Sequence, residues 1–310
     1  MVTKYTYKDL IWIDMESPSN QEVREIMEEY GLDPLVADEL LLPTMKPKID
    51  IYKEFVYLIL HFPAFKHTHG AQSNQEVDFI IGKNFLITTR YDTIDPMHKF
   101  SKVFEVNSVL DRSNIGSHAA YIFFYMAKKL YKSLDHELEV VSDSLENIEA
   151  QIYEGREKAM VIELSKVSRT LLNFKEALGP HREILQSLHS FVLEDRTNNR
   201  FFDQDFTRYS QTIIGEYYRV QNGVSAYLDS LAELRETNNS LVSTKQNEVM
   251  KVLTIMAFVT FPLSLVASIF GMNTEYLPIV GQQNDFWFIV GGMVIATTLF
   301  FIFFKYKRWL

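Results

Sequence analysis

The sequence of 310 residues contains no cysteine, which excludes disulfide bonds, thiolate metal sites and cysteine nucleophiles. This absence fits a reducing compartment. The first ten residues are polar, and the apolar patch at 10–13 is too short for the hydrophobic region of a signal peptide. We therefore expect everything before the first long hydrophobic run to remain in the cytoplasm.

Positive charge is the scarcer sign, with 31 Lys and Arg against 40 Asp and Glu, which gives a net charge of −9. The chain also lacks a basic stripe. This balance argues against nucleic acid as a partner.

Charge is absent altogether from two long runs near the C-terminus, at 252–270 and 286–304. At a rise of ~1.5 Å per residue, a helix over either run crosses a hydrocarbon core of ~30 Å. The loop at 271–285 that joins them is short and polar. The two runs therefore predict a hairpin that crosses the lipid bilayer of the cell membrane twice.

Basic residues flank the two ends of this hairpin, whereas the joining loop contains no Lys or Arg. They are Lys245 and Lys251 before the first run, and Lys305, Lys307 and Arg308 after the second. By the positive-inside rule, we expect both termini in the cytoplasm and the loop outside.

The first hundred residues alternate between short apolar runs and helical segments. Strands are expected at 11–13, 49–52, 55–60, 77–81 and 85–89. Helices are expected from Ser19 to Glu29, closed by Gly31, and from Asp33 to Leu42, stopped by Pro43. This order predicts an α+β domain whose mixed or antiparallel sheet is covered by helices.

Helical signals dominate from Asp95 onward. Helices are expected at 95–105, 117–154, 159–178 and 181–193, with a turn at 195–200. In the longest of these, apolar residues recur at three and four positions: Tyr121, Phe124, Leu130, Leu134, Leu138, Val141, Leu145, Ile148 and Ile152. The acidic residues between them, from Asp135 to Glu154, favour a solvated helix face over a cation-attracting surface.

A single helix of about sixty residues is expected from Phe206 into the first membrane run, because no strong breaker precedes Pro262. Gly215 and Gly223 each cost only ~1 kcal/mol. A helix of this length needs to pack in a bundle or against copies of itself.

One face of this helix carries a row with a period of 3.5 residues. Its members, spaced alternately by 3 and 4, are Asn247, Met250, Thr254, Ala257, Phe261, Ser264 and Ser268. This is the seam that a parallel helical bundle turns inward. Polar groups within a membrane face a cavity or a partner helix, so we interpret the row as the lining of a conduit. Tight packing of small residues is the alternative.

Two further features belong to the hairpin. Pro262 frees the carbonyl of Phe258 within the first span. On the second span, Gly292 and Ala296 form a pair of small residues that predicts a packing contact with the first.

The sequence around the loop resembles the CorA family of magnesium transport proteins. The resemblance rests on Phe270-Gly271-Met272-Asn273, on residues 247–254 (NEVMKVLT) and on Pro262. Residues 47–63 and 77–88 also resemble the N-terminal domain of that family, so the resemblance covers most of the chain.

This resemblance implies a homopentamer whose first spans line a central pore for Mg²⁺, with Co²⁺ or Ni²⁺ as further transported ions and no cofactor. Gly271, Met272 and Asn273 would form the outer mouth, and five Asn273 amides the selectivity ring. Mg²⁺ loses its water reluctantly, and neutral amide oxygens can hydrogen-bond that water without removing it. The implied gate residues are Met250, Leu253 and Phe261, and Asn247 forms the inner ring.

The resemblance assigns the chain six segments. They are a cytoplasmic α/β and helical domain (1–200), the cytoplasmic part of the stalk helix (201–251), a pore-lining span (252–270), the external loop (271–285), the second span (286–304) and a basic cytoplasmic tail (305–310).

The chain departs from the family pattern at several positions. The family commonly has Tyr where this chain has Phe270, and its best-known members have Met and Gly at the positions of Phe261 and Ser268. The stalk acid of a regulatory Mg²⁺ site corresponds to Thr212, with Glu216 one turn later. No regulatory residues are therefore assigned.

Three other functions compete with a magnesium channel. A Zn²⁺ transporter of the related branch tends to have Ile at the position of Met272. A membrane-tethered enzyme would use His67 and His69 as metal ligands and Glu163 or Asp78 as a base, but no third ligand follows in sequence. A coiled-coil tether would suit the long helices but needs no polar row in the bilayer.

Overall fold

The computed structural model describes residues 1–63, 74–109, 118–195, 202, 205–272, 281 and 284–307. The chain divides into two compact units, Met1–Arg235 and Glu236–Leu310. The long helix α7 (Phe206–Phe270) contributes residues to both of them.

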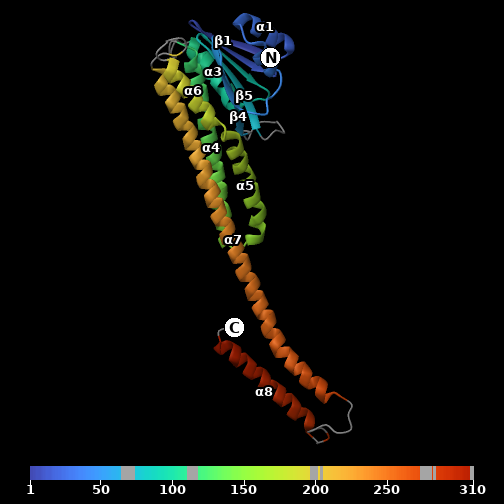
Figure 1. The fold of residues 1–310 in the computed structure, drawn as a ribbon. Helices are drawn as coiled ribbons and strands as arrows, with labels where there is room; N and C mark the ends of the chain where they lie inside the picture. Colours follow the sequence, from blue (N-terminus) through green and yellow to red (C-terminus); the bar gives the residue numbers. More distant parts are fainter. Residues whose placement is uncertain are drawn as a thin grey trace. The chain divides into compact units, whose positions relative to one another are not determined.

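A six-stranded mixed sheet forms the core of the first unit (Figure 1). Its strands are β1 (Val2–Tyr7), β2 (Leu10–Glu16), β3 (Lys48–Ile51), β4 (Phe55–Pro63), β5 (Asn74–Gly82) and β6 (Phe85–Arg90). They lie in the order β1-β2-β6-β5-β4-β3, with β2 and β6 parallel and every other neighbouring pair antiparallel. The expected mixed sheet is therefore confirmed, including the two hairpins β3–β4 and β5–β6.

Strand β1 was not expected from the sequence. It is an edge strand that pairs only with β2, and just one of its six residues, Tyr7, is buried. An edge strand that buries so little needs no apolar pattern, which explains the missing signal.

Helices cover both faces of this sheet. On one face, α1 (Asn20–Tyr30) and α2 (Pro34–Glu39) bury Val23, Ile26 and Val36 against the sheet residues Ile13 and Ile80. On the other face, the ring of Trp12 packs edge-on against Phe100 and Phe104 of α3 (Asp95–Val109), and Phe79 packs against Phe123 of α4 (Ala120–Tyr153).

The ends of α1 follow the sequence signals. The Ser19 side chain accepts a hydrogen bond from the backbone N–H of Glu22, and the Glu22 carboxylate accepts one from the backbone N–H of Ser19. Gly31 ends the helix with a φ of 63°, a conformation that glycine adopts without steric cost. Helix α2 ends at Glu39, earlier than expected, because Leu40 turns the chain before Pro43 is reached.

The helical part of the first unit contains α4, α5 (Glu157–Leu178), α6 (His181–Asp195) and the first part of α7. All nine apolar positions expected to line the inner face of α4 are buried. Helix α7 runs unbroken for 65 residues, as expected. At Gly223, a Cβ would lie 3.3 Å from Leu138 Cδ1, so glycine lets α7 approach α4 closely. The expected turn at 195–200 lies, beyond its first residue, outside the described residues.

The second unit consists of the last part of α7 and of α8 (Asp285–Tyr306). Its small core joins Ile255 and Val259 of α7 to Phe304 of α8, with Leu263 and Phe300 packed against them. The two helices therefore form the expected hairpin.

Candidate functional site

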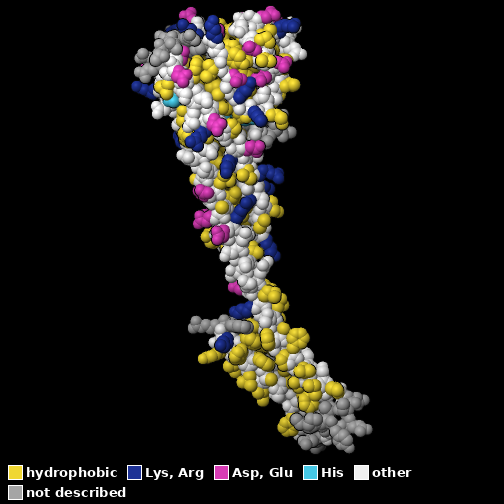
Figure 2. Space-filling model, in the orientation of Figure 1, with side chains coloured by type: hydrophobic (Ala, Val, Ile, Leu, Met, Phe, Trp, Pro, Cys, Tyr) yellow, Lys and Arg dark blue, Asp and Glu magenta, His cyan; other side chains and the backbone are white. Residues whose placement is uncertain are grey.

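The two helices of the second unit are long and apolar, yet almost entirely exposed. Both contain an 18-residue window of mean hydropathy 2.2, of which only 11% is buried in α7 and 0% in α8. Figure 2 shows hydrophobic side chains over the visible face of this unit. A core helix of a soluble protein would hide such residues, so these helices have the properties of membrane spans.

Helix α8 packs on one defined face of α7. That face contains the two buried residues Ile255 and Val259, and Leu263 packs with them. Further along, Val266 and Phe270 line a cavity shared with α8. The contact with α8 therefore follows one helical row from Ile255 to Phe270.

The polar row predicted from the sequence lies opposite this contact. Residues 259, 263, 266 and 270 each stand two positions after a member of the polar row, namely 257, 261, 264 and 268. Two residues turn an α-helix by about 200°. The row from Asn247 to Ser268, which we call the polar seam, therefore faces away from α8.

The structure leaves this seam uncovered. Met250 is 61% exposed and Phe261 74%, and Leu253 beside the seam is 55% exposed, although all three are large and apolar. The remaining predicted lining residues are exposed except for half-buried Ala257: Asn247, Thr254, Ala257, Ser264 and Ser268. No residue of α8 covers them within the described part of this unit, which leaves this surface available to molecules outside the hairpin.

The hydroxyl of Thr254 donates a hydrogen bond of 2.8 Å to the backbone carbonyl of Met250 on its own helix. Its proton is thereby used within the helix, and its oxygen lone pairs stay available. This group therefore offers the seam a hydrogen-bond acceptor, the kind of group that metal-bound water needs.

Helix α7 ends at the start of the Gly-Met-Asn motif. The N–H of Gly271 donates to the carbonyl of Ala267 at 2.9 Å, and that of Met272 donates to Ile269 at 3.3 Å. A Cβ on Gly271 would lie 3.1 Å from the Ala267 oxygen, which favours glycine there. Asn273 lies outside the described residues.

Phe270 lies on the side of α7 that faces α8, because it lines the cavity between the two helices. A Tyr at this position, as the family commonly has, would therefore attach to α7 on the side away from the seam. The departure from the family pattern at Phe270 leaves the seam residues unchanged.

Gly292 and Ala296 of α8 face α7, but they do not pack tightly on it. Both line the same cavity of about 260 Å³, together with Pro262. A Cβ placed on Gly292 would meet no atom within 4 Å. The prediction that this glycine packs closely against the first span of the same chain is therefore wrong.

The structure gives no support to the candidate bases of an enzyme. Asp78 is completely buried, and burial together with the neighbouring Glu76 raises its pKa well above the usual value. Tyr91 donates a hydrogen bond of 3.4 Å to its carboxyl group. Asp78 is therefore a core residue that substrate cannot reach.

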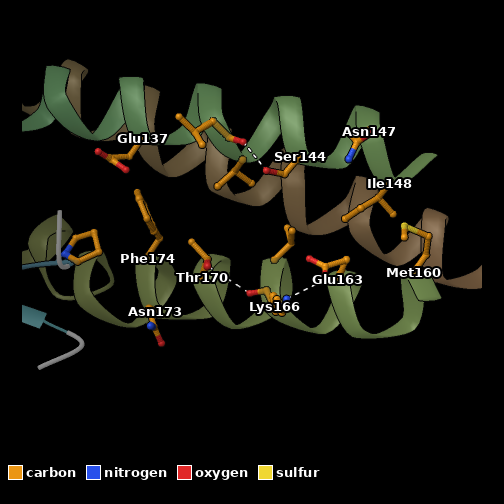
Figure 3. A pocket seen from close by; sticks show the side chains of 14 residues that line it. Glu137, Ser144, Asn147, Ile148, Met160, Glu163, Lys166, Thr170, Asn173 and Phe174 are labelled. Carbon is orange, nitrogen blue, oxygen red and sulfur yellow. Dashed lines mark hydrogen bonds and ion pairs between the residues drawn. The ribbon is translucent and has the colours of Figure 1, made fainter. Parts of the chain in front are cut away.

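Glu163 lines a groove of about 530 Å³ between α4 and α5 (Figure 3). Its carboxylate forms an ion pair of 2.8 Å with Lys166, one turn away on the same helix. His67 and His69 lie outside the described residues. Within the described residues, no three His, Asp or Glu side chains are grouped to hold a metal ion.

The side chains of Thr212 and Glu216, at and one turn after the position of the family's stalk acid, already have partners within the same chain. Thr212 donates its hydroxyl proton to the carbonyl of Arg208 at 2.9 Å. The carboxylate of Glu216 forms an ion pair with Arg219 and approaches Lys128 at 4.0 Å. Glu216 is therefore already neutralised by cations of the same chain.

A large α/β unit joined by one long helix to a two-span hairpin defines a membrane protein with a single C-terminal hairpin. The family model described as "CorA-like Mg2+ transporter protein" matches residues 7–308. The chain therefore belongs to the CorA-like Mg²⁺ transporter family, which supports a transporter rather than an enzyme or a tether.

Named relatives agree with this assignment. The chain is 27% identical to the cobalt/magnesium transport protein CorA of Thermotoga maritima, over 96% of this chain and 83% of the relative. It is 23% identical to the CorA protein of Methanocaldococcus jannaschii, over 97% of this chain and 92% of the relative.

Solved structures share the fold. The complete structure of the CorA magnesium transporter from Methanocaldococcus jannaschii matches with a TM-score of 0.83, at 20% identity, over 97% of this chain and 92% of that one. The full-length CmaX protein matches with a TM-score of 0.74, at 18% identity, over 97% of this chain and 89% of that one. These matches confirm the predicted fold class.

Proposed function

We propose that this protein is a homopentameric channel through which Mg²⁺ enters the cell, with Co²⁺ and Ni²⁺ as further permeant ions. One observation carries the proposal: the polar seam of α7 faces away from α8 and is exposed. Polar groups at membrane depth need water or a partner. Copies of α7 arranged around an axis provide both, because their seams enclose an aqueous path.

The chemistry of the seam suits a hydrated divalent cation. Neutral amide and hydroxyl oxygens, from Asn247, Thr254, Ser264 and Ser268, accept hydrogen bonds from the water shell of Mg²⁺. A ring of carboxylates would bind the ion more strongly and slow its release. Five Asn273 amides at the outer mouth would select the ion in the same way.

Apolar side chains divide this path at three levels. Met250, Leu253 and Phe261 are all more than half exposed in the single chain. In a ring of copies, such side chains narrow the path and exclude water, which closes a pore without a covalent or charged gate. We assign the gate to these three residues.

The arrangement of charge gives the orientation in the cell membrane. The two ends of the hairpin away from the loop carry Lys251, Lys305 and Lys307. By the positive-inside rule, both termini are therefore cytoplasmic and the loop 271–285 is external. Residues 1–200 then form the cytoplasmic domain and residues 201–251 the stalk that leads to the pore-lining span 252–270. Cobalt is included because two relatives are named cobalt/magnesium transport proteins.

Uptake of Mg²⁺ into liposomes that contain purified protein and an internal Mg²⁺ indicator tests this function. Asn273→Ala is expected to abolish uptake, because it removes the amide ring. Asn284→Ala provides a matched control, since it makes the same substitution beyond the proposed mouth and should conduct normally. Unchanged uptake by Asn273→Ala would contradict the proposal, and uptake of Zn²⁺ in preference to Mg²⁺ would favour a zinc transporter.

A further inference from the structure

The polar seam is bordered on each side by a row of exposed residues. We propose that neighbouring copies of α7 pack through these two rows: Leu265 and Met272 of one copy against Thr260 and Ala267 of the next. This inference rests on the proposed pore and names the surface that assembles it. The occupant of each row is therefore a second copy of this chain.

Both rows follow from the period of the seam. In heptad notation the seam occupies positions a and d, because its spacing alternates between 3 and 4. Phe258, Leu265 and Met272 then occupy position e. Thr260 and Ala267 occupy position g. These two positions flank the seam of a parallel bundle, and each contacts the neighbouring helix.

The first row is free to take a partner. Phe258 is 59% exposed, Leu265 62% and Met272 57%. Phe258 also borders an open apolar cavity of about 730 Å³ that continues over Leu299 and Phe303 of α8. This row, which we call the large row, therefore presents long apolar side chains, and one of them, Phe258, borders an unfilled crevice.

The second row is equally free but smaller. Thr260 and Ala267 are both exposed. The hydroxyl of Thr260 donates a hydrogen bond of 2.9 Å to the carbonyl of Met256 on its own helix. Its proton therefore needs no partner across an apolar contact, and this small row can pack against hydrocarbon side chains.

The two rows are complementary in size. In a parallel seam, position g of one helix meets position e of the next heptad on its neighbour. The resulting pairs are Thr260 with Leu265 and Ala267 with Met272. Each pair joins a smaller residue to a larger one, so the large row of one helix fits the small row of the next.

Lipid is a poorer occupant than a second copy. The rows adjoin the polar seam directly, and α8 covers the side of α7 opposite that seam. Acyl chains on both rows would have to meet over Thr254, Ser264 and Ser268, leaving those groups facing hydrocarbon. Copies of α7 cover the rows and supply the seam with an aqueous path in the same step.

The geometry of adjacent helices makes the pairing measurable by disulfide formation. Helix axes that pack at about 8–10 Å, with Cα atoms at a radius of about 2.3 Å, bring directly facing Cα atoms to about 3.4–5.4 Å and flanking ones somewhat further apart, which overlaps the range of about 4.4–6.8 Å that disulfides span. Because the chain contains no cysteine, every bridge formed comes from introduced residues.

The test uses the full-length double variant Thr260→Cys/Leu265→Cys, oxidised in membranes with copper phenanthroline. We expect a ladder of cross-linked species up to the pentamer on a non-reducing gel, which collapses to monomer with dithiothreitol. Within one helix, residues five apart lie about 7.5 Å along the axis and point about 140° apart, so they cannot bridge to each other. Each single variant should remain monomeric on the gel.

Two results would overturn the pairing while leaving the pore intact. One is a double variant that conducts Mg²⁺ when reduced and still forms no ladder. The other is cross-linking of Leu265→Cys alone, which would show that the large row meets itself. If the double variant fails to assemble, Ala267→Cys/Met272→Cys tests the same pairing one heptad later, and a missing ladder there overturns it. A wild-type chain that neither assembles nor conducts would instead refute the proposed function.

Discussion

The Nε2–H of His181 donates a hydrogen bond of 2.8 Å to the backbone carbonyl of His61, which lies 120 residues earlier in the chain. A carbonyl only accepts, so Nε2 carries the ring proton and Nδ1 accepts the hydroxyl proton of Tyr131, also at 2.8 Å. Complete burial lowers the pKa of His181 to about 3, so the ring is neutral. This chain of bonds joins the first turn of α6 to β4 and α4.

Replacing His181 with Ala should destabilise the cytoplasmic unit by about 2–4 kcal/mol, because it leaves the Tyr131 hydroxyl and the His61 carbonyl buried without partners. The thermal unfolding midpoint of the full-length protein in detergent measures this loss. Tyr131→Phe, which removes one hydroxyl, should cost less. Equal midpoints for wild type and His181→Ala would contradict the assigned bonding.

The same residue predicts a dependence on pH. The pKa of folded His181 is about 3 and the ordinary value is 6.5, so the folded state favours the neutral ring. Its contribution is complete above pH 6.5 and is lost as the pH falls towards 3. The difference in midpoint between wild type and His181→Ala should therefore narrow from pH 7 to pH 4.5. A difference that widens on acidification would exclude a neutral buried ring.

For Asp78, we predict that folding stability depends on pH in the opposite direction. Its folded pKa is raised above the ordinary 3.8, so the folded state holds the proton more tightly than the unfolded chain does. Stability is therefore lost as the pH rises above 3.8 towards the folded value. Asp78→Asn, which cannot ionise, should gain in unfolding midpoint relative to wild type between pH 5 and pH 8. A relative loss over that range would show that the buried group is an ionised carboxylate.

Gly292→Ala should leave Mg²⁺ uptake unchanged and stabilise α8 by up to ~1 kcal/mol, because alanine favours a helix and the added Cβ meets no atom. The amount of oligomer that survives heating, compared with wild type, measures the effect. Loss of the oligomer in Gly292→Ala would show that a neighbouring copy packs against this glycine.

Phe261→Ala should increase Mg²⁺ leak through the resting channel. The ring of Phe261 is 74% exposed on the seam, and its removal widens one apolar level of the proposed path. Liposome uptake at low driving force measures the leak. Phe258→Ala, on the large row, is the comparison variant and should leak less. Equal or lower uptake by Phe261→Ala would remove this residue from the gate.

Much of the fold could be predicted because its signals are local. The periodic apolar positions of α4 are all buried, and Ser19 and Gly31 mark the two ends of α1. Strand β1 could not be found, because an edge strand that buries one residue carries almost no pattern. The buried state of Asp78 was equally hidden, since it depends on helices that pack over the sheet.

The polar seam could be predicted because its 3.5-residue spacing is visible in the sequence. Its position relative to α8 could not be predicted. Only the contacts of Ile255 and Val259 with Phe304 show which side of α7 is already covered. Phe270, where the family commonly has Tyr, lies on this same side of α7 and lines a cavity shared with α8. The cavity beside Gly292 contradicted a packing motif that sequence alone favours.

The most direct test of the central claim compares block by Cd²⁺ at two positions two residues apart on α7. Ser264→Cys lies on the seam, whereas Val266→Cys lies on the side that faces α8. Cd²⁺ carries the charge of Mg²⁺ and binds thiolates, so it should enter the path and be held by a ring of cysteines. We predict that micromolar Cd²⁺ stops Mg²⁺ uptake by Ser264→Cys and leaves Val266→Cys conducting. Block of Val266→Cys with Ser264→Cys unaffected would show that the seam does not line the conducting path.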